Sequence, residues 1–173
     1  MTAYVRGDDN SLKIWVARRN RNLRTYPGML DSTVAGGVKA TDSPWDCIIA
    51  ESEEEARLPK SLTEKRVKPT GVVTLANKNP RNELFHCEML YVYDLELQPD
   101  EKPVPGDDDE VEEFVLMEWK EVVEKMLASE FKPNVCPVMI DFFIRHGLVA
   151  QEEKDYVEIC TRLRRALPMA TSK

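Results

Sequence analysis

The chain has 173 residues, of which 42% are hydrophobic and 32% charged, a composition typical of a folded globular domain rather than of a disordered segment. A formal net charge of −7 argues against a protein with general affinity for nucleic acid. No apolar stretch approaches the roughly 20 residues that cross a bilayer, and no charged-then-apolar leader opens the chain, so we expect a cytoplasmic protein without a membrane span.

Cysteine and histidine usage argues against two further kinds of site. The four cysteines are scattered without a C-x-x-C pair, which is typical of reduced thiols rather than of a disulfide scaffold or a zinc site. They are Cys47, Cys87, Cys136 and Cys160. Two histidines are too few for a histidine-based metal site. A chain of this length can bury one substantial core, so we expect a single domain over residues 1–173.

The first predicted elements are two β-strands, at residues 3–7 and 12–18, joined by the polar turn 8–10. In the second strand, LKIWVAR, large aliphatic residues recur at every second position, which is the period of a strand. A third strand, MLDSTVAGG, is expected at residues 29–37.

A basic segment between these strands contains Arg18, Arg19, Arg21 and Arg24. Such a run is usually a solvated loop. It is alternatively a phosphate grip, because guanidinium groups bind phosphate oxygens bidentately. The segment leads straight into Tyr26 and the third strand, which favours the phosphate interpretation.

Residues 35–58, AGGVKATDSPWDCIIAESEEEARL, predict a Gly-Gly turn followed by a helix. Ser43 is a good N-cap, Pro44 suits the first helical position, and Asp46 places negative charge in the first turn. The apolar residues of this helix fall on one flank, at the spacing of a buried stripe. That flank contains Trp45, Ile48, Ile49, Ser52 and Ala56.

Glu51, Glu54 and Glu55 fall together on a different flank, because spacings of three and four residues bring helical side chains within reach of each other. Three like charges on one face repel, and a hard divalent cation such as Mg²⁺ or Mn²⁺ would relieve that repulsion. A solvated acidic face is the alternative. The turn at Gly36 and Gly37 favours the metal, because glycine lets backbone carbonyls and a bound diphosphate approach closely.

Farther along, a charged loop is expected after Pro59, and VKPTGVVTLAN then predicts a strand with Gly71 as a bulge or close-approach point. Residues 83–97, ELFHCEMLYVYDLEL, are the strongest predicted strand, because aromatic and β-branched residues dominate them. The periodicity leaves open which face of this strand points inward. Glu88 is either a site residue or a charge on the sheet face.

Residues 98–110, QPDEKPVPGDDDE, predict a proline- and acid-rich surface loop, and the strand VEEFVLM follows it. Three helical stretches close the chain: EWKEVVEKML, PVMIDFFIRHG and EEKDYVEICTRLRRAL. His146, near the end of the second stretch, is expected to be a cap or core partner rather than a catalyst. Strands, a central helix, more strands and then helices predict an α+β layered domain.

The stretch around the glutamates resembles the Nudix box, whose pattern is G-x5-E-x7-R-E-U-x-E-E-x-G-U, with U an apolar residue. The pattern starts at Gly36, places Glu51 after the arginine position and Glu54-Glu55 at the paired glutamates, and ends at Leu58. Four positions depart from the pattern: Asp42 replaces Glu, Ala50 replaces Arg, Ser52 replaces an apolar residue and Arg57 replaces Gly. In Nudix enzymes that arginine orients the metal-binding carboxylates, so the alanine bears directly on activity.

Phrases along nearly the whole chain narrow the resemblance: WVARR, YPGMLDSTVAGG, ESEEEARLP, YVYDLEL, EVEEFVLM, EFKPN and DFFIRHG. They are similar to a Nudix subfamily of fungi and plants related to the Nudix part of fungal thiamine pyrophosphokinase fusions. Some relatives act on oxidised, damaged forms of thiamine diphosphate and release the monophosphate. We expect residues 1–173 to form a single Nudix domain. Because many relatives carry an extra N-terminal domain, the alternative is that the chain is a fragment that lacks this domain.

The resemblance implies the Nudix fold, a mixed β-sheet sandwiched between α-helices. It also implies that Glu51, Glu54, Glu55 and the carbonyl of Ala35 hold Mg²⁺ or Mn²⁺. A carboxylate must take the proton from the attacking water. Glu54 and a distal glutamate such as Glu112 are the candidates for this base, and Glu110 and Glu113 are further candidates by position.

Substrate contacts are expected on both sides of this metal site. Arg18, Arg19 and Arg24 are candidates for gripping phosphate, and Gly36 and Gly37 would line the diphosphate. The organic end of the substrate would stack on one of two aromatic residues. These are Trp15, which is alternatively a core residue, and Tyr26.

Three functions compete at this point. The first is a diphosphatase for thiamine diphosphate or its damaged analogues, which the subfamily phrases favour. The second is a Nudix hydrolase of nucleoside diphosphate derivatives such as ADP-ribose, and the third is a catalytically weak ligand-binding protein, suggested by Ala50 and Asp42. In each case the partner is a small-molecule diphosphate rather than nucleic acid or membrane. Many Nudix proteins pair as homodimers, and the same is expected here.

Overall fold

The computed structural model of the chain describes residues 1–7, 11–78 and 83–168. The polar turn expected at residues 8–10 therefore lies outside the described residues. The strands form one mixed sheet in the order β3-β2-β1-β5-β4, with β6 paired to β2. Their bounds are Thr2–Arg6 (β1), Leu12–Arg19 (β2), Leu30–Asp31 (β3), Lys68–Lys78 (β4), Phe85–Leu97 (β5) and Val111–Glu118 (β6).

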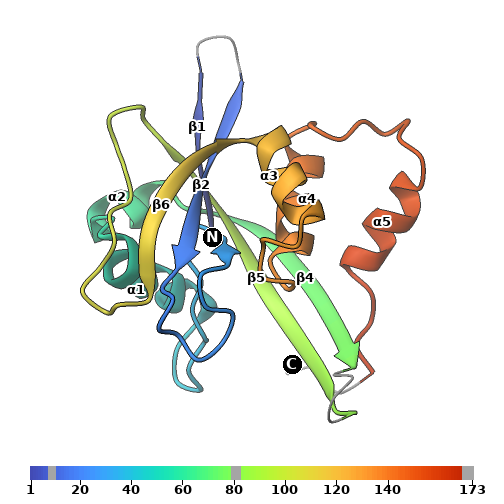
Figure 1. Cartoon of the computed structure of the whole chain (residues 1–173), viewed down its shortest axis with the longest axis horizontal. Helices are drawn as coiled ribbons and strands as arrows, with labels where there is room; N and C mark the ends of the chain where they lie inside the picture. The colour runs from blue at the N-terminus through green and yellow to red at the C-terminus, as the bar shows by residue number, and fades with distance from the viewer. Residues whose placement is uncertain (8–10, 79–82, 169–173) are drawn as a thin grey trace.

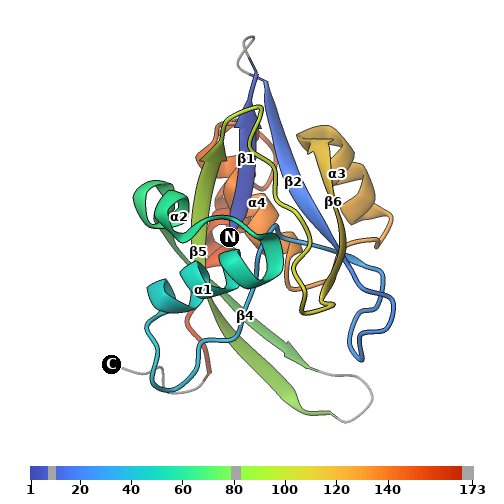
Figure 2. The ribbon, with the colours of Figure 1, turned by 90° about the vertical axis from the view of Figure 1, so that its left-hand side faces the viewer.

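Helices cover both faces of this sheet. Their bounds are Pro44–Ala56 (α1), Lys60–Arg66 (α2), Trp119–Leu127 (α3), Cys136–Arg145 (α4) and Tyr156–Leu163 (α5). Figure 1 shows α1 and α2 on one side of the strands and α3, α4 and α5 on the other. Figure 2, a view from the side of the first pair, shows α1 and α2 in front of the strands. The predicted α+β class and the helix-sheet-helix sandwich are confirmed.

Alternation along β1 and β2 supplies both halves of the core, because successive side chains of a strand point to opposite faces. Ala3 and Trp15 are buried in a cluster with Ile48 of α1. Their neighbours Tyr4 and Ile14 belong to a second cluster, on the side of α3 and α4. Trp15 is therefore a core residue, with 8% of its surface exposed. It does not line the cavity in which a substrate would bind.

The sheet opens along half of β5. β1 runs parallel to β5 and pairs with it only over residues 94–97, whereas β4 pairs with β5 in the antiparallel sense from Phe85 to Asp94. Residues 85–93 thus have β4 on one side and no described strand on the other. Figure 1 shows the same arrangement, with β4 and β5 extending together beyond the rest of the sheet. In an antiparallel pair alternate peptide groups point away from the partner, so this edge carries unpaired backbone groups.

Both faces of β5 are covered from Val92 onward, which explains why periodicity could not choose between them. Leu90 and Val92 pack with residues of α4 and α5. Tyr93 and Leu95 lie in the cluster beneath α1. A strand buried on two sides shows no clean alternation of apolar and polar residues.

The predicted strand at residues 29–37 is wrong over most of its length, since β3 contains only Leu30 and Asp31. Beyond Asp31, hydrogen bonds from side chains take the place of the backbone hydrogen bonds of the sheet. The Thr33 hydroxyl donates to the carbonyl of Trp15 at 2.5 Å and accepts from the amide of Ala3 at 2.8 Å. The segment after β3 therefore leaves the sheet as a loop that is tied to it through side chains.

Two other predicted boundaries need correction. The charged loop expected after Pro59 is the helix α2, whose Thr63 hydroxyl bonds back to the carbonyl of Lys60 at 3.1 Å. The last helix is shorter than its apolar pattern indicates, because α5 ends at Leu163. The bulge expected at Gly71 is confirmed, with a register shift between Pro69 and Gly71.

His146 is a core partner, as expected. Its Nε2 lies 2.9 Å from Asp94 Oδ2, and its ring stacks on Phe142 with 4.0 Å between centroids. Arg145 also binds the Asp94 carboxylate, and Asp94 is 5% exposed. Across the residues that the structure describes, none of the helices combines the length and apolar character needed to span a membrane.

Candidate active site

The helix α1 begins as its sequence predicts. Ser43 Oγ accepts from the amide of Asp46 at 3.1 Å, and Pro44 occupies the first turn. The helix ends at Arg57, whose φ of 49° lies in the left-handed region. The apolar flank packs on the sheet, with Trp45 6.1 Å from Tyr93 between ring centroids. This packing turns the glutamate flank toward the loop after β3.

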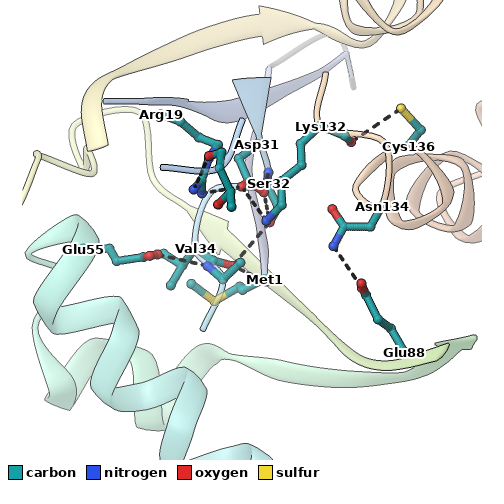
Figure 3. A network of polar contacts seen from close by, with 12 residues as sticks. Met1, Arg19, Asp31, Ser32, Val34, Glu55, Glu88, Lys132, Asn134 and Cys136 are labelled. Atoms are coloured by element: carbon teal, nitrogen blue, oxygen red, sulfur yellow. Dashed lines mark hydrogen bonds and ion pairs between the residues drawn. The ribbon is translucent and has the colours of Figure 1, made fainter. Parts of the chain in front are cut away.

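Glu55 is the most buried glutamate of this flank, with 6% of its surface exposed. The amide of Ala35 donates to Glu55 Oε2 at 3.0 Å, and Figure 3 shows the Glu55 side chain directed at the loop around Val34. Burial raises the pKa of Glu55 to about 8; the Ala35 amide opposes the rise, and the charges of Glu51, Asp31 and Glu110 add to it. A solvated acidic face does not describe this residue.

Glu51 lies against the glycine turn. A Cβ added to Gly36 would stand 2.1 Å from Glu51 Oε1, so a larger residue at this position would displace the Glu51 carboxylate. Burial raises the pKa of Glu51, and the charges of Glu54 and Glu110 raise it further, while Lys39 opposes them. Glu54 is exposed at the edge of the same cluster.

Residues 103–110, which we call the strap, dock on the end of α1. The amides of Val104 and Gly106 donate to the carbonyls of Ala56 and Glu55 at 2.9 and 3.0 Å, satisfying groups that a helix end leaves unpaired. A Cβ on Gly106 would stand 1.7 Å from the carbonyl oxygen of Glu54. The strap therefore needs a glycine to approach the helix this closely.

The strap also decides which distal glutamate reaches the cluster. Glu110, at its end, lines the cavity described below and raises the pKa of both Glu51 and Glu55 through its charge. Glu112 instead pairs with Arg21 at 3.3 Å, and Glu113 pairs with Arg18 at 2.7 Å. Of the three predicted distal candidates, only Glu110 lies beside the box glutamates.

A cavity of about 1000 Å³ connects these carboxylates to the open edge of β5. Ala35, Gly36, Gly37, Glu51 and Glu110 line it on the side of α1. Residues 88–92 of β5 and the segment before α4 line the other side. Its cationic lining residues are Arg19, Lys39 and Lys132.

Asp31 holds two of these cations in place. Its Oδ2 lies 3.2 Å from Arg19 Nη1 and 3.2 Å from Lys132 Nζ, and Asp31 itself is 4% exposed (Figure 3). A parallel bridge between Leu30 and Phe131 brings Lys132 beside β3. Sequence reasoning missed Lys132 and Asp31; their only signal was the phrase EFKPN and the predicted strand.

Glu88 also lines this cavity, which settles where its side chain lies. Asn134 Nδ2 donates to Glu88 Oε2 at 3.0 Å, and Figure 3 shows the pair at the opposite end of the network from Glu55. The sequence left Glu88 open between a site residue and a sheet-face charge. It lies on the cavity wall.

The other predicted substrate residues are scattered. Arg18 is engaged by Glu113 and by the carbonyl of Gly28, and it does not line the cavity. Arg24 and Tyr26 are exposed on the loop between β2 and β3, away from the cavity wall. Only Arg19 of the basic segment reaches the cavity.

The chemistry of the carboxylate cluster fits a hard divalent cation. Its donors are carboxylate oxygens, and burial raises the pKa of both Glu51 and Glu55, with the charges of neighbouring carboxylates adding to the rise. In the described part of the chain, no three acidic, histidine or cysteine side chains are already gathered as a metal cage.

Comparison with known proteins adds an independent line of evidence. Residues 1–137 match the family model of the NUDIX domain. The chain is 39% identical to the uncharacterized protein YJR142W of Saccharomyces cerevisiae, over 95% of this chain and 51% of that protein. It is 35% identical to Nudix hydrolase 20, chloroplastic, of Arabidopsis thaliana, over 95% of this chain and 43% of that protein. The chain thus spans about half the length of the curated relatives it matches.

Solved structures show the same fold. The crystal structure of RenU, a Nudix hydrolase from M. smegmatis, superposes with a TM-score of 0.59 at 11% identity, covering 88% of this chain and 86% of that one. At that identity the likeness concerns the fold alone.

Proposed function

The chain belongs to the Nudix family, and we propose that it hydrolyses an organic diphosphate to the monophosphate with the help of a divalent cation. One observation carries the proposal. A cluster of glutamates from α1 and the strap borders a cavity of about 1000 Å³ that also contains Arg19, Lys39 and Lys132. A metal-bound diphosphate requires carboxylates that hold the metal ion and, beside them, cationic side chains that bind the phosphate oxygens.

Glu51, Glu54 and Glu55 would hold the cation, together with the carbonyl of Ala35 that the family resemblance implies. Nudix enzymes generally use divalent metal ions, and Mg²⁺ or Mn²⁺ suits these oxygen donors. When bound, such a cation neutralises diphosphate oxygens and lowers the pKa of a coordinated water.

The remaining chemistry falls to side chains of the cavity. Arg19 and Lys132, held by Asp31, would bind and orient the phosphate oxygens. A carboxylate would accept the proton from the attacking water. Glu54 and Glu110 are the residues we propose for that base, since the charge of each acts on Glu51, whereas Glu112 is paired with Arg21.

For the substrate we propose thiamine diphosphate or one of its oxidised, damaged analogues. The support is the run of subfamily phrases along the chain, several of which supply cavity residues. EFKPN contributes Lys132 and Asn134, and DSTVAGG contributes Asp31, Ser32 and the glycine turn. The alternative substrates are ADP-ribose and related nucleoside diphosphate derivatives. The alternative to an enzyme is a catalytically weak protein that binds a diphosphate.

The organisation of the whole protein stays a prediction. We propose that residues 1–173 act as one Nudix domain, and a homodimer and a cytoplasmic location are predicted from the sequence. The Arabidopsis relative, Nudix hydrolase 20, is a chloroplastic protein.

Chromatographic identification of the monophosphate products from a panel of diphosphates, each with Mg²⁺, Mn²⁺ or a chelator, tests the proposal. Thiamine monophosphate as the product supports the first substrate class, and AMP from ADP-ribose supports the second. Binding without turnover of any diphosphate in either metal would favour the weak-binding alternative and remove the enzyme proposal.

A further inference from the structure

The far end of the cavity is chemically distinct from the end at the carboxylate cluster. Glu88, on the open stretch of β5, faces the cavity beside Asn134, which precedes α4. Around them the lining residues are mostly apolar: Met89, Leu90, Tyr91, Val92, Val135 and Val138. A flat organic group would find aliphatic side chains, one aromatic ring and a single anionic side chain here.

The hydrogen bond between Asn134 and Glu88 leaves another polar atom of Asn134 without a partner. Glu88 in its ionised form only accepts hydrogen bonds, so the amide must present Nδ2 to it and direct Oδ1 elsewhere. Oδ1 is buried and has no partner among the described residues. A buried acceptor without a donor costs about 1–3 kcal/mol, so holding Glu88 in this position lowers the stability of the fold. Unsatisfied groups of this kind need a reason outside packing.

We propose that Glu88 is a recognition residue for the organic group of the diphosphate substrate, and that Asn134 is the positioning residue that fixes its carboxylate. The inference rests on the proposed function, because it assigns the far end of the same cavity. It also names a substrate class: a diphosphate whose organic group carries an N–H donor, as an amino- or lactam-bearing heterocycle does.

Charge separation within the cavity supports this assignment. Arg19 and Lys132 lie beside Asp31, toward the loop after β3, and would attract the phosphate end. Glu88 would repel phosphate and attract an N–H group or a cationic ring. The two ends therefore bind the substrate in one direction only.

Discrimination follows from the chemistry of the acceptor. A carboxylate in a partly apolar pocket loses its hydrogen bonds to water when the ligand enters. A ligand with an N–H donor replaces those bonds, and one without it leaves the carboxylate unpaired. Sites of this type reject the analogue that lacks the donor far more strongly than a hydrophobic pocket rejects a missing methylene.

Matched pairs of ligands test the proposal. Thiamine diphosphate is compared with its 4′-deamino analogue, and ADP-ribose with the counterpart in which unsubstituted purine replaces adenine. Both kcat/KM and the Kd from titration calorimetry are measured with Mg²⁺. For the pair that binds, we expect at least about a tenfold preference for the member with the amino group, which corresponds to one good hydrogen bond.

Variants separate recognition from packing. In Glu88→Gln, Asn134 still has a carbonyl to bind, but the group facing the ligand becomes an NH₂ donor, so the preference should fall below about threefold through KM rather than kcat. Asn134→Ala should weaken the preference in the same direction while thermal unfolding confirms a folded protein. Glu96→Gln is the control, since Glu96 lies on β5 outside the cavity and accepts from Tyr4.

The outcomes for the two proposals differ. Turnover with equal rates for both members of a pair, or an undiminished preference in Glu88→Gln, would overturn the recognition role and leave the diphosphatase proposal standing. A binding preference that Glu88→Gln abolishes, without any turnover, would support the recognition role and remove the diphosphatase. Failure of all four ligands to bind would overturn the recognition role.

Discussion

The amide of Ala35 donates a 3.0 Å hydrogen bond to the buried carboxylate of Glu55 and so joins the loop after β3 to the acidic flank of α1. The contact keeps a carboxylate in a place where burial raises its pKa to about 8. Such a group is stabilised in the ionised form only by a cation or by further donors.

Glu54→Gln and Glu55→Gln should each lower turnover by on the order of 10²-fold or more, as the loss of a cation ligand or a base does. The measurement is the rate of monophosphate formation from the best diphosphate at saturating Mg²⁺. Glu53→Gln is the matched control, because Glu53 is an exposed glutamate of the same helix outside the cluster. Rates like those of the parent in both cluster variants would remove the mechanism.

Gly106→Ala should detach the strap from α1. The new Cβ would stand 1.7 Å from a backbone oxygen, which cannot rotate away, so we expect a loss of about 2 kcal/mol in the free energy of unfolding. Activity should fall as well, since Glu110 follows the strap. Urea unfolding and initial rates measure the two effects.

Gly37→Ala serves as the stability control for that variant, because a Cβ at Gly37 has nothing within 4 Å. An equal loss of stability in both variants would show that the close approach of Gly106 is not the cause.

Ala50→Arg should raise turnover several-fold. Ala50 is exposed on α1, and Glu54 lies four residues later on the same helix, within reach of a guanidinium group. A planar guanidinium can orient a carboxylate bidentately, whereas an ammonium cannot. Ala50→Lys is therefore the control, with a smaller gain. Unchanged kcat in both variants would indicate that carboxylate orientation does not limit the reaction.

Asp94 should make the fold sensitive to acid. Burial raises the pKa of Asp94, but hydrogen bonds from His146 and Arg145 outweigh it and hold the pKa below the ordinary value of 3.8. The unfolded chain therefore takes up this proton first as the pH falls, so the stabilisation from Asp94 is lost from the ordinary value downward through the folded pKa.

Asp94→Asn tests this linkage. It should cost about 3 kcal/mol at neutral pH, because it removes one partner of a buried ion pair. The loss of stability on acidification should also be shallower than in the parent. Urea unfolding across the acidic range measures both, and parallel curves for the two proteins would assign the acid sensitivity to other groups.

Local patterns predicted much of the fold. Ser43, Pro44 and the apolar flank marked the start and orientation of α1, because capping and helical periodicity act within a few residues. The bulge at Gly71 and the length of β5 followed from similar short-range signals. The spacing of Glu51, Glu54 and Glu55 likewise placed three carboxylates on one flank before any contact was known.

Other parts of the site had no such signal. Asp31 and Lys132 are separated by 101 positions and meet only because Leu30 bridges to Phe131. Glu110 rather than Glu112 reaches the cluster because the strap hydrogen-bonds to the end of α1.

The sequence alone therefore determined the described helices other than α2, the main strands and the carboxylate flank, since each depends on interactions between near neighbours. Tertiary structure decided which of those carboxylates are buried, which cations face them and where the cavity opens along β5. These features arise from packing between distant segments, and no pattern within a short stretch of chain encodes them.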